Sequence, residues 1–310
     1  MEAVIAIALP VFAVIAAGVF AGKRAILSDT DVNALNRFVF LFAMPAALFG
    51  LTATASPPSG EDLKIALAYG VSAALVMAFA YIQGKKFFAL APQAAGAHAY
   101  VATLGNAVFL GLPIALAVEG WAAHFVVLML IEGVFVIAAG IVLTSPPDQS
   151  PGLGRLLRSF RTPIVSAMLA GIAYSAFIRP LGFSDPAPIF GFIEILGRAA
   201  GPTALFSLGL FFSTASMPSF STIRMHIAAI TALKLIVLPV LAIGGALALG
   251  VRDPMLLGPL SLFTLVPSGI GTYIVASQVG HYEKETVAAI GATTLLSLFT
   301  ISAVLAYWSG

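Results

Sequence analysis

Ten long apolar runs, separated by charged residues, prolines or glycines, constrain this chain more than any other feature. A helix needs about 20 apolar residues to cross about 30 Å of hydrocarbon. Only 9% of the residues are charged, whereas soluble proteins carry about 25%. A transmembrane β-barrel would instead show alternating segments of about ten residues. We therefore expect an all-α membrane protein whose ten transmembrane helices lie at residues 3–21, 32–54, 63–84, 94–118, 121–144, 163–178, 187–214, 222–249, 255–278 and 286–308.

The lysines and arginines between these runs predict an orientation, because cytoplasmic loops retain positive charge. The turns on one side carry nine of these residues, and the turns on the other side carry only Lys64, Arg179 and Arg252. This predicts a multi-pass protein of the cell membrane with both termini outside and a cytoplasmic connector at residues 145–162. The connector is either a short basic helix on the membrane surface or an unstructured basic segment.

The residue types available argue against several functional classes. The chain has no cysteine, and its four histidines lack the spacing of metal ligands. We find no Ser-His-Asp arrangement, phosphate-binding loop or carboxylate cluster, so we expect no enzyme activity, cofactor or metal. A net charge of +2 without a basic stripe gives no indication of nucleic-acid binding. The expected partners are a small substrate and the lipid bilayer.

The two halves of the sequence are similar to each other. Residues 44–51 (MPAALFGL) and 201–208 (GPTALFSL) are identical at five of eight positions. A proline follows each string in a later run, 68 residues after Pro45 and 65 residues after Pro202. Each half has an odd number of spans, so the second must be inserted upside down relative to the first. We expect two inverted five-helix repeats, at residues 1–144 and 163–310, joined by the connector.

Two of the runs contain clusters of glycine and proline, at residues 105–113 and 265–271. Proline removes a backbone donor and glycine loosens a helix, so both clusters should unwind their helices near the bilayer midplane. Unwound backbone is tolerated at that depth only inside a protein-lined cavity, and helix N-termini favour anions. A single proline would more simply kink a packed helix. Two clusters at corresponding repeat positions favour a pair of broken helices, in spans four and nine.

Three polar residues are expected deep in the membrane. Asn106, inside the first cluster, carries a neutral amide that can donate to a carboxylate; its alternative role is an interhelical hydrogen bond. Lys234 is expected roughly 15 Å into the bilayer, where a charge is costly and indicates a functional group. Glu132 is equally central, and the two charges form either a structural ion pair or a coupling group with its counter-ion. Glu194 and Arg198, four residues apart, predict a local pair on one helix face, with substrate contact as the alternative.

Four separated strings resemble the auxin efflux carrier family. They are LNRFVFLFAMP at residues 35–45, NAVFLGLP at 106–113, ALFSLGLF at 204–211 and VPSGI at 266–270. The strings follow the order of the family along nearly the whole chain. That family of PIN-like transporters includes the plant PIN auxin exporters and bacterial carriers of malonate and other organic acids.

The resemblance implies a fold shared with bile-acid symporters and sodium/proton antiporters. In that fold a scaffold, here residues 1–54 and 163–214, forms a homodimer, which we expect to involve spans two and seven. A transport domain, here residues 63–144 and 222–308, carries the two broken helices. The mechanism implied is an elevator-like movement of this transport domain against the scaffold.

The resemblance also implies a substrate site where the broken helices cross. Asn106 would contact the substrate carboxylate, and Pro113 and Pro267 would mark the crossover. Ser268 and Gly269 would expose backbone groups there. The few side-chain oxygens near this point argue against a dedicated sodium site, which needs several oxygen ligands.

The chain departs from plant members of the family in two ways. Its connector has 18 residues where many plant members have a long cytosolic loop, which argues against regulation by loop phosphorylation. Its third span has no acidic residue where plant members can carry one, which argues against auxin itself and against proton coupling by that route. We expect a secondary transporter of small organic carboxylates, such as auxin-like, malonate-like or keto acids. The alternatives are a sodium-coupled bile-acid-type symporter and a membrane receptor or channel that uses the same cavity.

Overall fold

The computed structural model describes residues 2–54, 58–145, 163–179, 187–214 and 220–308. All regular secondary structure in these residues is helical, and one isolated antiparallel bridge pairs Gly105 with Ser268. The all-helical class predicted from the sequence is therefore confirmed. The predicted basic connector at residues 145–162 lies outside the described residues, except for Ser145.

The helices follow the chain in two series, in which η denotes a π-helical turn. In the first half they are α1 (Glu2–Lys23), α2 (Asp29–Phe38), η1 (Val39–Ala43), α3 (Met44–Thr54), α4 (Gly60–Lys86), α5 (Pro92–Thr103), η2 (Ala107–Gly111), α6 (Leu112–Ala117), α7 (Trp121–Ile131), η3 (Glu132–Val136) and α8 (Ile137–Thr144). In the second half they are α10 (Pro163–Ala173), η4 (Tyr174–Ile178), α11 (Ala187–Arg198), α12 (Ala200–Thr214), α13 (Phe220–Ala232), η6 (Leu233–Val237), α14 (Leu238–Ala248), α15 (Pro254–Leu265), α16 (Gly271–Val279) and α17 (Glu283–Trp308).

Helix ends follow local sequence signals. At the start of α4, Asp62 N donates to Ser59 Oγ (3.1 Å) and Ser59 N donates to Asp62 Oδ2 (2.7 Å), which completes a capping box. At the start of α15, Met255 N donates to Asp253 Oδ1 (2.9 Å). Between α6 and α7, Gly120 has a φ of 81°, a left-handed conformation that glycine adopts without strain.

Six continuous helices are long and apolar enough to cross a membrane. They lie at Thr30–Thr54, Gly60–Lys86, Trp121–Thr144, Phe190–Ser213, Ile223–Ala248 and Glu283–Trp308. These helices fall on the second, third, fifth, seventh, eighth and tenth expected spans. Shorter apolar helices at Leu9–Lys23, Ala107–Ala117, Pro163–Ile178 and Pro254–Leu265 fall on the other four. The membrane class is confirmed, and the full number of ten crossings stays a prediction.

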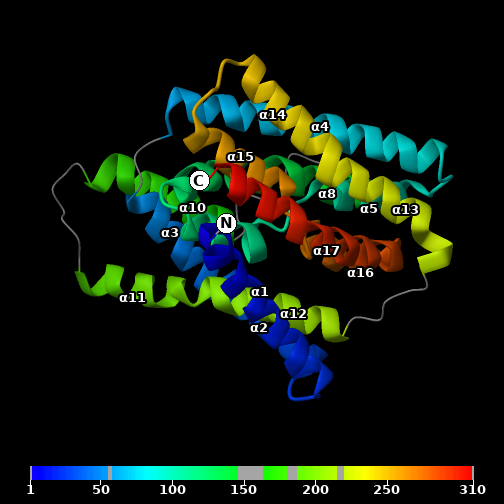
Figure 1. Ribbon diagram of the computed structural model, residues 1–310, viewed down its shortest axis with the longest axis horizontal. Coiled ribbons are helices and arrows are strands. Elements are labelled where there is room, and N and C mark those ends of the chain that lie inside the picture. The colour runs from blue at the N-terminus through cyan, green and yellow to red at the C-terminus, as the bar shows by residue number, and fades with distance from the viewer. Residues whose placement is uncertain (1, 55–57, 146–162, 180–186, 215–219, 309–310) are drawn as a thin grey trace.

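Two close helix pairs join the halves of the chain. Helix α1 packs against α12 (Figure 1), where a Cβ atom on Gly18 would lie 2.1 Å from Phe206 O and one on Gly209 would lie 1.9 Å from Ile15 O. Helix α3 packs against α10, whose Gly171 has no room for a Cβ atom beside α3. Small residues of this kind let helix backbones approach closely in membranes. Each pair contains one helix from the first half and one from the second.

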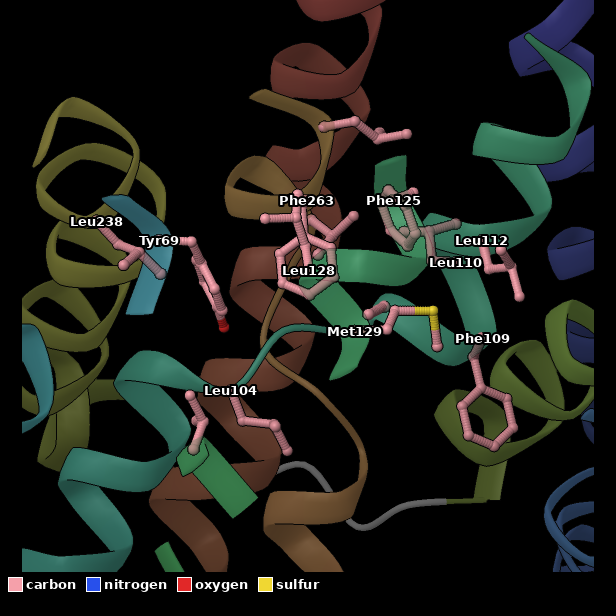
Figure 2. Close-up of a cluster of buried hydrophobic side chains, with 14 of the residues drawn as sticks. Tyr69, Leu104, Phe109, Leu110, Leu112, Phe125, Leu128, Met129, Leu238 and Phe263 are labelled. Atoms are coloured by element: carbon pink, nitrogen blue, oxygen red, sulfur yellow. The ribbon is translucent and has the colours of Figure 1, made fainter. Parts of the chain in front are cut away.

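The largest apolar cluster gathers side chains from α4, η2, α6, α7, α14 and α15, as Figure 2 shows. Its aromatic rings meet edge to face. The ring of Phe263 lies 4.8 Å from that of Tyr69 and 4.9 Å from that of Phe125, measured between centroids. This packing surrounds the ends of two interrupted helices, which form the candidate site.

Candidate functional site

Two helices are interrupted where they meet inside the bundle. Helix α5 ends at Thr103 and helical structure resumes at η2, while α15 ends at Leu265 and α16 begins at Gly271. The intervening residues 104–106 and 266–270 are not helical, and the antiparallel bridge pairs Gly105 of the first segment with Ser268 of the second. The predicted interruptions are confirmed. We call these two segments the crossover.

Backbone hydrogen bonds join the two segments of the crossover directly. Asn106 N donates to Pro267 O (2.8 Å), and Gly269 N donates to Leu104 O (3.0 Å). These bonds satisfy backbone groups that the interruption of each helix would otherwise leave unpaired. The crossover is therefore a defined structural element and more than a pair of kinks.

The two prolines predicted to mark the crossover are placed differently. Pro267 lies within the second segment, and its carbonyl accepts the bond from Asn106. Pro113 lies at the second position of α6, beyond the π-helical turn η2, and so outside the first interruption. Helix α5 ends at Thr103 and helical structure resumes at Ala107, before Pro113. Helical structure is continuous from Ala107 to Ala117, so Pro113 lies inside this short helix, just after its π-helical turn.

Ser268 and Gly269 also differ from expectation, because protein groups already use their backbone N–H groups. Ser268 N donates to Thr293 Oγ1 (3.1 Å), and Ser268 Oγ donates to Val101 O (2.8 Å). Gly269 N donates across the crossover, and Gly269 O accepts from Thr272 Oγ1 (2.7 Å). The backbone expected to be exposed here is therefore engaged within the protein.

The side-chain amide of Asn106 is the exception. The residue is 2% exposed, and its Nδ2 atom has no hydrogen-bond partner. Among the described residues, only Ser261 Oγ and Thr294 Oγ1 share this condition, and both lie on helices outside the two crossover segments. An unpaired buried donor costs about 1–3 kcal/mol. The crossover thus contains one strong donor without an acceptor.

Two buried charged residues, Glu132 and Lys234, form hydrogen bonds with backbone at or beside the crossover. Glu132 Oε1 accepts from Gly105 N (2.9 Å) and from Tyr69 O–H (2.9 Å), and Lys234 Nζ donates to Thr264 O (3.0 Å) near the end of α15. A Cβ atom on Gly105 would lie 3.3 Å from Glu132 Oε1 and 3.5 Å from Lys234 Nζ. Both charged groups therefore flank the same glycine.

Glu132 and Lys234 do not form a direct ion pair within 4.0 Å; the ion pairs among the described residues involve other groups. Each charge bonds backbone at or beside the crossover instead. Both residues lie in π-helical turns, η3 and η6. Such turns are frequent at functional sites, because the extra residue re-aims side chains.

Sequence reasoning missed several of these contacts. In the sequence, Tyr69 is simply a tyrosine within an apolar helix. Its hydrogen bond to Glu132 joins residues that are 63 positions apart, so no local pattern indicates it. The third expected span, residues 63–84, contains no acidic residue, yet Asp62 just before it is buried and bonds His124 (Nδ1 to Oδ1, 2.5 Å). The predicted local pair of Glu194 and Arg198 is confirmed, at 2.5 Å on an exposed surface.

A second polar cluster, which we call the histidine–tyrosine cluster, consists of Gln83, His98, His226 and Tyr282. The Tyr282 hydroxyl lies 2.8 Å from His98 Nδ1 and 2.7 Å from His226 Nδ1, and His98 Nε2 lies 3.1 Å from Gln83 Oε1. With Gln83 Oε1 as acceptor, His98 donates from Nε2 and accepts at Nδ1 from the Tyr282 hydroxyl. The Tyr282 oxygen in turn accepts from His226 Nδ1. Burial and the neighbouring Glu285 raise the pKa of Tyr282, so its hydroxyl stays a donor.

Comparison with known proteins agrees with this architecture. A sequence profile of the family described as membrane transport protein matches residues 3–150 and 153–305. A protein of Rhizobium meliloti (strain 1021), provisionally named a malonate transporter, is 27% identical over 327 residues, covering 98% of this chain and 96% of the relative. The uncharacterized transporter YfdV of Escherichia coli (strain K12) is 25% identical over 300 residues, covering 93% and 92%.

A shorter match covers 37% of this chain and 38% of the uncharacterized transporter MJ1031 of Methanocaldococcus jannaschii, at 32% identity over 117 residues. The family and these relatives are transporters, so this chain is a membrane transporter and not an enzyme. With a match across nearly its whole length, the chain belongs to the membrane transport protein family, which is the family of the auxin efflux carriers.

Proposed function

We propose that the chain is a secondary transporter of small organic carboxylates, which it binds at the crossover. The observation that carries this proposal is the buried Nδ2 atom of Asn106, which has no acceptor. A substrate carboxylate would supply one, because an ionised carboxylate is purely an acceptor. Binding would then remove the cost of the unpaired donor.

The electrostatics of the crossover also favour an anion. Helical structure begins at Ala107 on one side of the crossover and at Gly271 on the other. The first N–H groups of a helix carry partial positive charge. In combination with the unpaired amide of Asn106, these helix starts support carboxylate binding more than cation binding.

The substrate class is supported by the name of one relative. The Rhizobium meliloti protein is provisionally named for malonate, and it aligns with 98% of this chain. We propose that this chain transports malonate-like acids, keto acids or auxin-like acids. The side-chain amide of Asn106 would bind one carboxylate of each acid. Pro113, Pro267, Ser268 and Gly269 would shape the site through their backbone.

We further propose an elevator-like mechanism on an inverted repeat of ten spans. Residues 1–54 and 163–214 would form a scaffold that dimerises through spans two and seven, and residues 63–144 and 222–308 would move against it. The helix pairs support this, since span one (α1) packs against span seven (α12) and span two (α3) against span six (α10), the exchanged pairing that two related halves would make. Both termini would lie outside the cell.

Glu132 is proposed to couple substrate binding to a proton, with Lys234 as its counter-ion. The support is its bond to Gly105 N, the residue next to Asn106 in sequence. The alternative role is support of the crossover backbone alone. Uptake measured between pH 5 and pH 8 separates them: Glu132→Gln loses the pH dependence of the wild type if Glu132 couples, and keeps it if Glu132 only supports the backbone.

The site itself is tested by uptake into proteoliposomes of labelled malonate, pyruvate and indole-3-acetate. Asn106→Ala is expected to lower uptake of the transported acid at least tenfold, because the carboxylate loses its donor. Asn33→Ala, at an exposed asparagine of α2, is the matched control and should transport normally. Normal uptake by Asn106→Ala, or no uptake of any of the three acids by the wild type, would contradict the proposal.

A further inference from the structure

A cavity of about 380 Å³ lies beside the start of α4. Its walls come from the end of α3, the start of α4, the middle of α7, and α10 with η4; none of the crossover residues lines it. Under the proposed division, α3 and α10 belong to the scaffold, whereas α4 and α7 belong to the transport domain. Ligand pockets usually have volumes of about 300–1,000 Å³. The cavity can therefore hold a small organic molecule between the two proposed bodies.

One polar group in this cavity is free to bind a ligand. The carboxylate of Asp62 accepts from Ser59 N and Ser59 Oγ (both 2.7 Å) and faces His124 Nδ1 at 2.5 Å. A carboxylate only accepts, so Nδ1 of His124 carries the hydrogen. The other ring nitrogen, Nε2, has no partner among the described residues, and the side chain is 26% exposed. Asp62 thus fixes the ring and leaves Nε2 available.

The rest of the lining is mostly apolar. Val126, Val127 and Leu130 of α7 and Ile172 of α10 line the cavity. The hydroxyl of Thr52, which also lines the cavity, already donates to Leu48 O within α3 (2.7 Å). An apolar wall with one well-oriented polar group is typical of a small-molecule site. It suits a molecule with a hydrocarbon body and a single hydrogen-bonding end.

We infer that this cavity is a second binding site for the organic acid, distinct from the crossover, with the carboxyl group on His124 Nε2 and the hydrocarbon body against Val126, Leu130 and Ile172. The inference rests on the proposed function for its choice of ligand. Nε2 can accept from a carboxylic acid or, when the ring is protonated, donate to a carboxylate. Acids with an apolar body bind here, whereas malonate, which has none, binds weakly.

Equilibrium dialysis of purified protein in nanodiscs with labelled indole-3-acetate tests this site. Ala176→Phe adds a ring to the η4 wall of the cavity and leaves the residues Asp62 and His124 in place, and His124→Gln removes the imidazole. We expect the wild type to bind two equivalents per chain and Ala176→Phe to bind one. His124→Gln should weaken one class of sites at least threefold. Asn106→Ala, which leaves the cavity intact, should retain this class and lose the other.

Gel filtration and a thermal melt of each variant verify that it is folded. The inference is overturned if the wild type binds no equivalent, or binds one equivalent that Asn106→Ala loses, and also if either folded cavity variant binds like the wild type. The failure of the proposed function is a separate result, because it would appear as unchanged binding and uptake in Asn106→Ala. With labelled malonate in the same experiment, Ala176→Phe should bind as many equivalents per chain as the wild type.

Discussion

The crossover and the histidine–tyrosine cluster are both buried and polar, but they differ in how their hydrogen bonds are completed. In the cluster, His98, His226 and Tyr282 each have a partner of the correct polarity. In the crossover, backbone hydrogen bonds join the two segments and the amide of Asn106 is left over. A complete network rigidifies a structure, whereas an incomplete one has a place for a ligand. From this difference we propose that the cluster contributes to stability and that the crossover binds the substrate.

The largest effect on stability is expected from Lys234→Met. Removing one buried charge leaves Glu132 without its nearby opposite charge, a change that costs about 3–5 kcal/mol in buried pairs. The free energy of unfolding in detergent measures this loss. The double variant Glu132→Gln with Lys234→Met should recover part of it, because no isolated charge is then buried. Equal losses in the single and double variants would show that the two charges act independently.

A smaller loss, with a strong effect on transport, is expected from Gly105→Ala. The added Cβ atom would lie 3.0 Å from Val266 Cγ2 and beside both charged groups, so the crossover must shift. Overpacking of this kind costs about 1–3 kcal/mol. Gly60→Ala is the control, since nothing lies within 4 Å of its Cβ position. If Gly105→Ala takes up substrate as well as Gly60→Ala does, the claim that transport needs a glycine at position 105 is contradicted.

Tyr282→Phe tests the role proposed for the histidine–tyrosine cluster. It leaves His98 and His226 without their shared partner, which should cost about 1–3 kcal/mol of stability. Because the side-chain hydrogen bonds described for the cluster join its own residues and none of them reaches the crossover segments, the KM of uptake should stay the same. A thermal melt and an uptake titration on the same preparation check both statements. A changed KM with unchanged stability would reverse the roles assigned to the two regions.

The smallest effect is expected from Arg198→Ala. Its pair with Glu194 is 77% and 61% exposed, respectively, and such surface pairs contribute about 0–1 kcal/mol. Unfolding should therefore differ from the wild type by less than about 1 kcal/mol, and uptake should be normal. A large loss of either would show that this helix face is buried in the functional assembly.

Much of this architecture could be predicted because it depends on local sequence. Apolar runs identified the membrane helices, and glycine with proline in two runs identified the interruptions. The exact break could not be placed, because the π-helical turn η2 lets the helix restart six residues before Pro113. That turn depends on packing against Phe125 and Val266, which meet Gly111 from distant segments.

The polar contacts were harder to predict because their partners are far apart in sequence. Tyr282 bonds His98 across 184 residues, and Glu132 bonds Gly105 across 27. The expected depth in the membrane selected Glu132, Lys234 and Asn106 as candidates, since charged and amide groups are costly there, and the structure buries all three. It could not predict that each charge would bond backbone instead of the other charge.

Equilibrium binding of the transported acid to purified wild type, Asn106→Ala and Tyr282→Phe tests the central claim most directly. The account predicts that Asn106→Ala raises the Kd of the crossover site at least tenfold, equivalent to about 1.4 kcal/mol, while Tyr282→Phe leaves it unchanged. An unchanged Kd in folded Asn106→Ala protein would contradict the claim that the unpaired amide at the crossover binds the substrate.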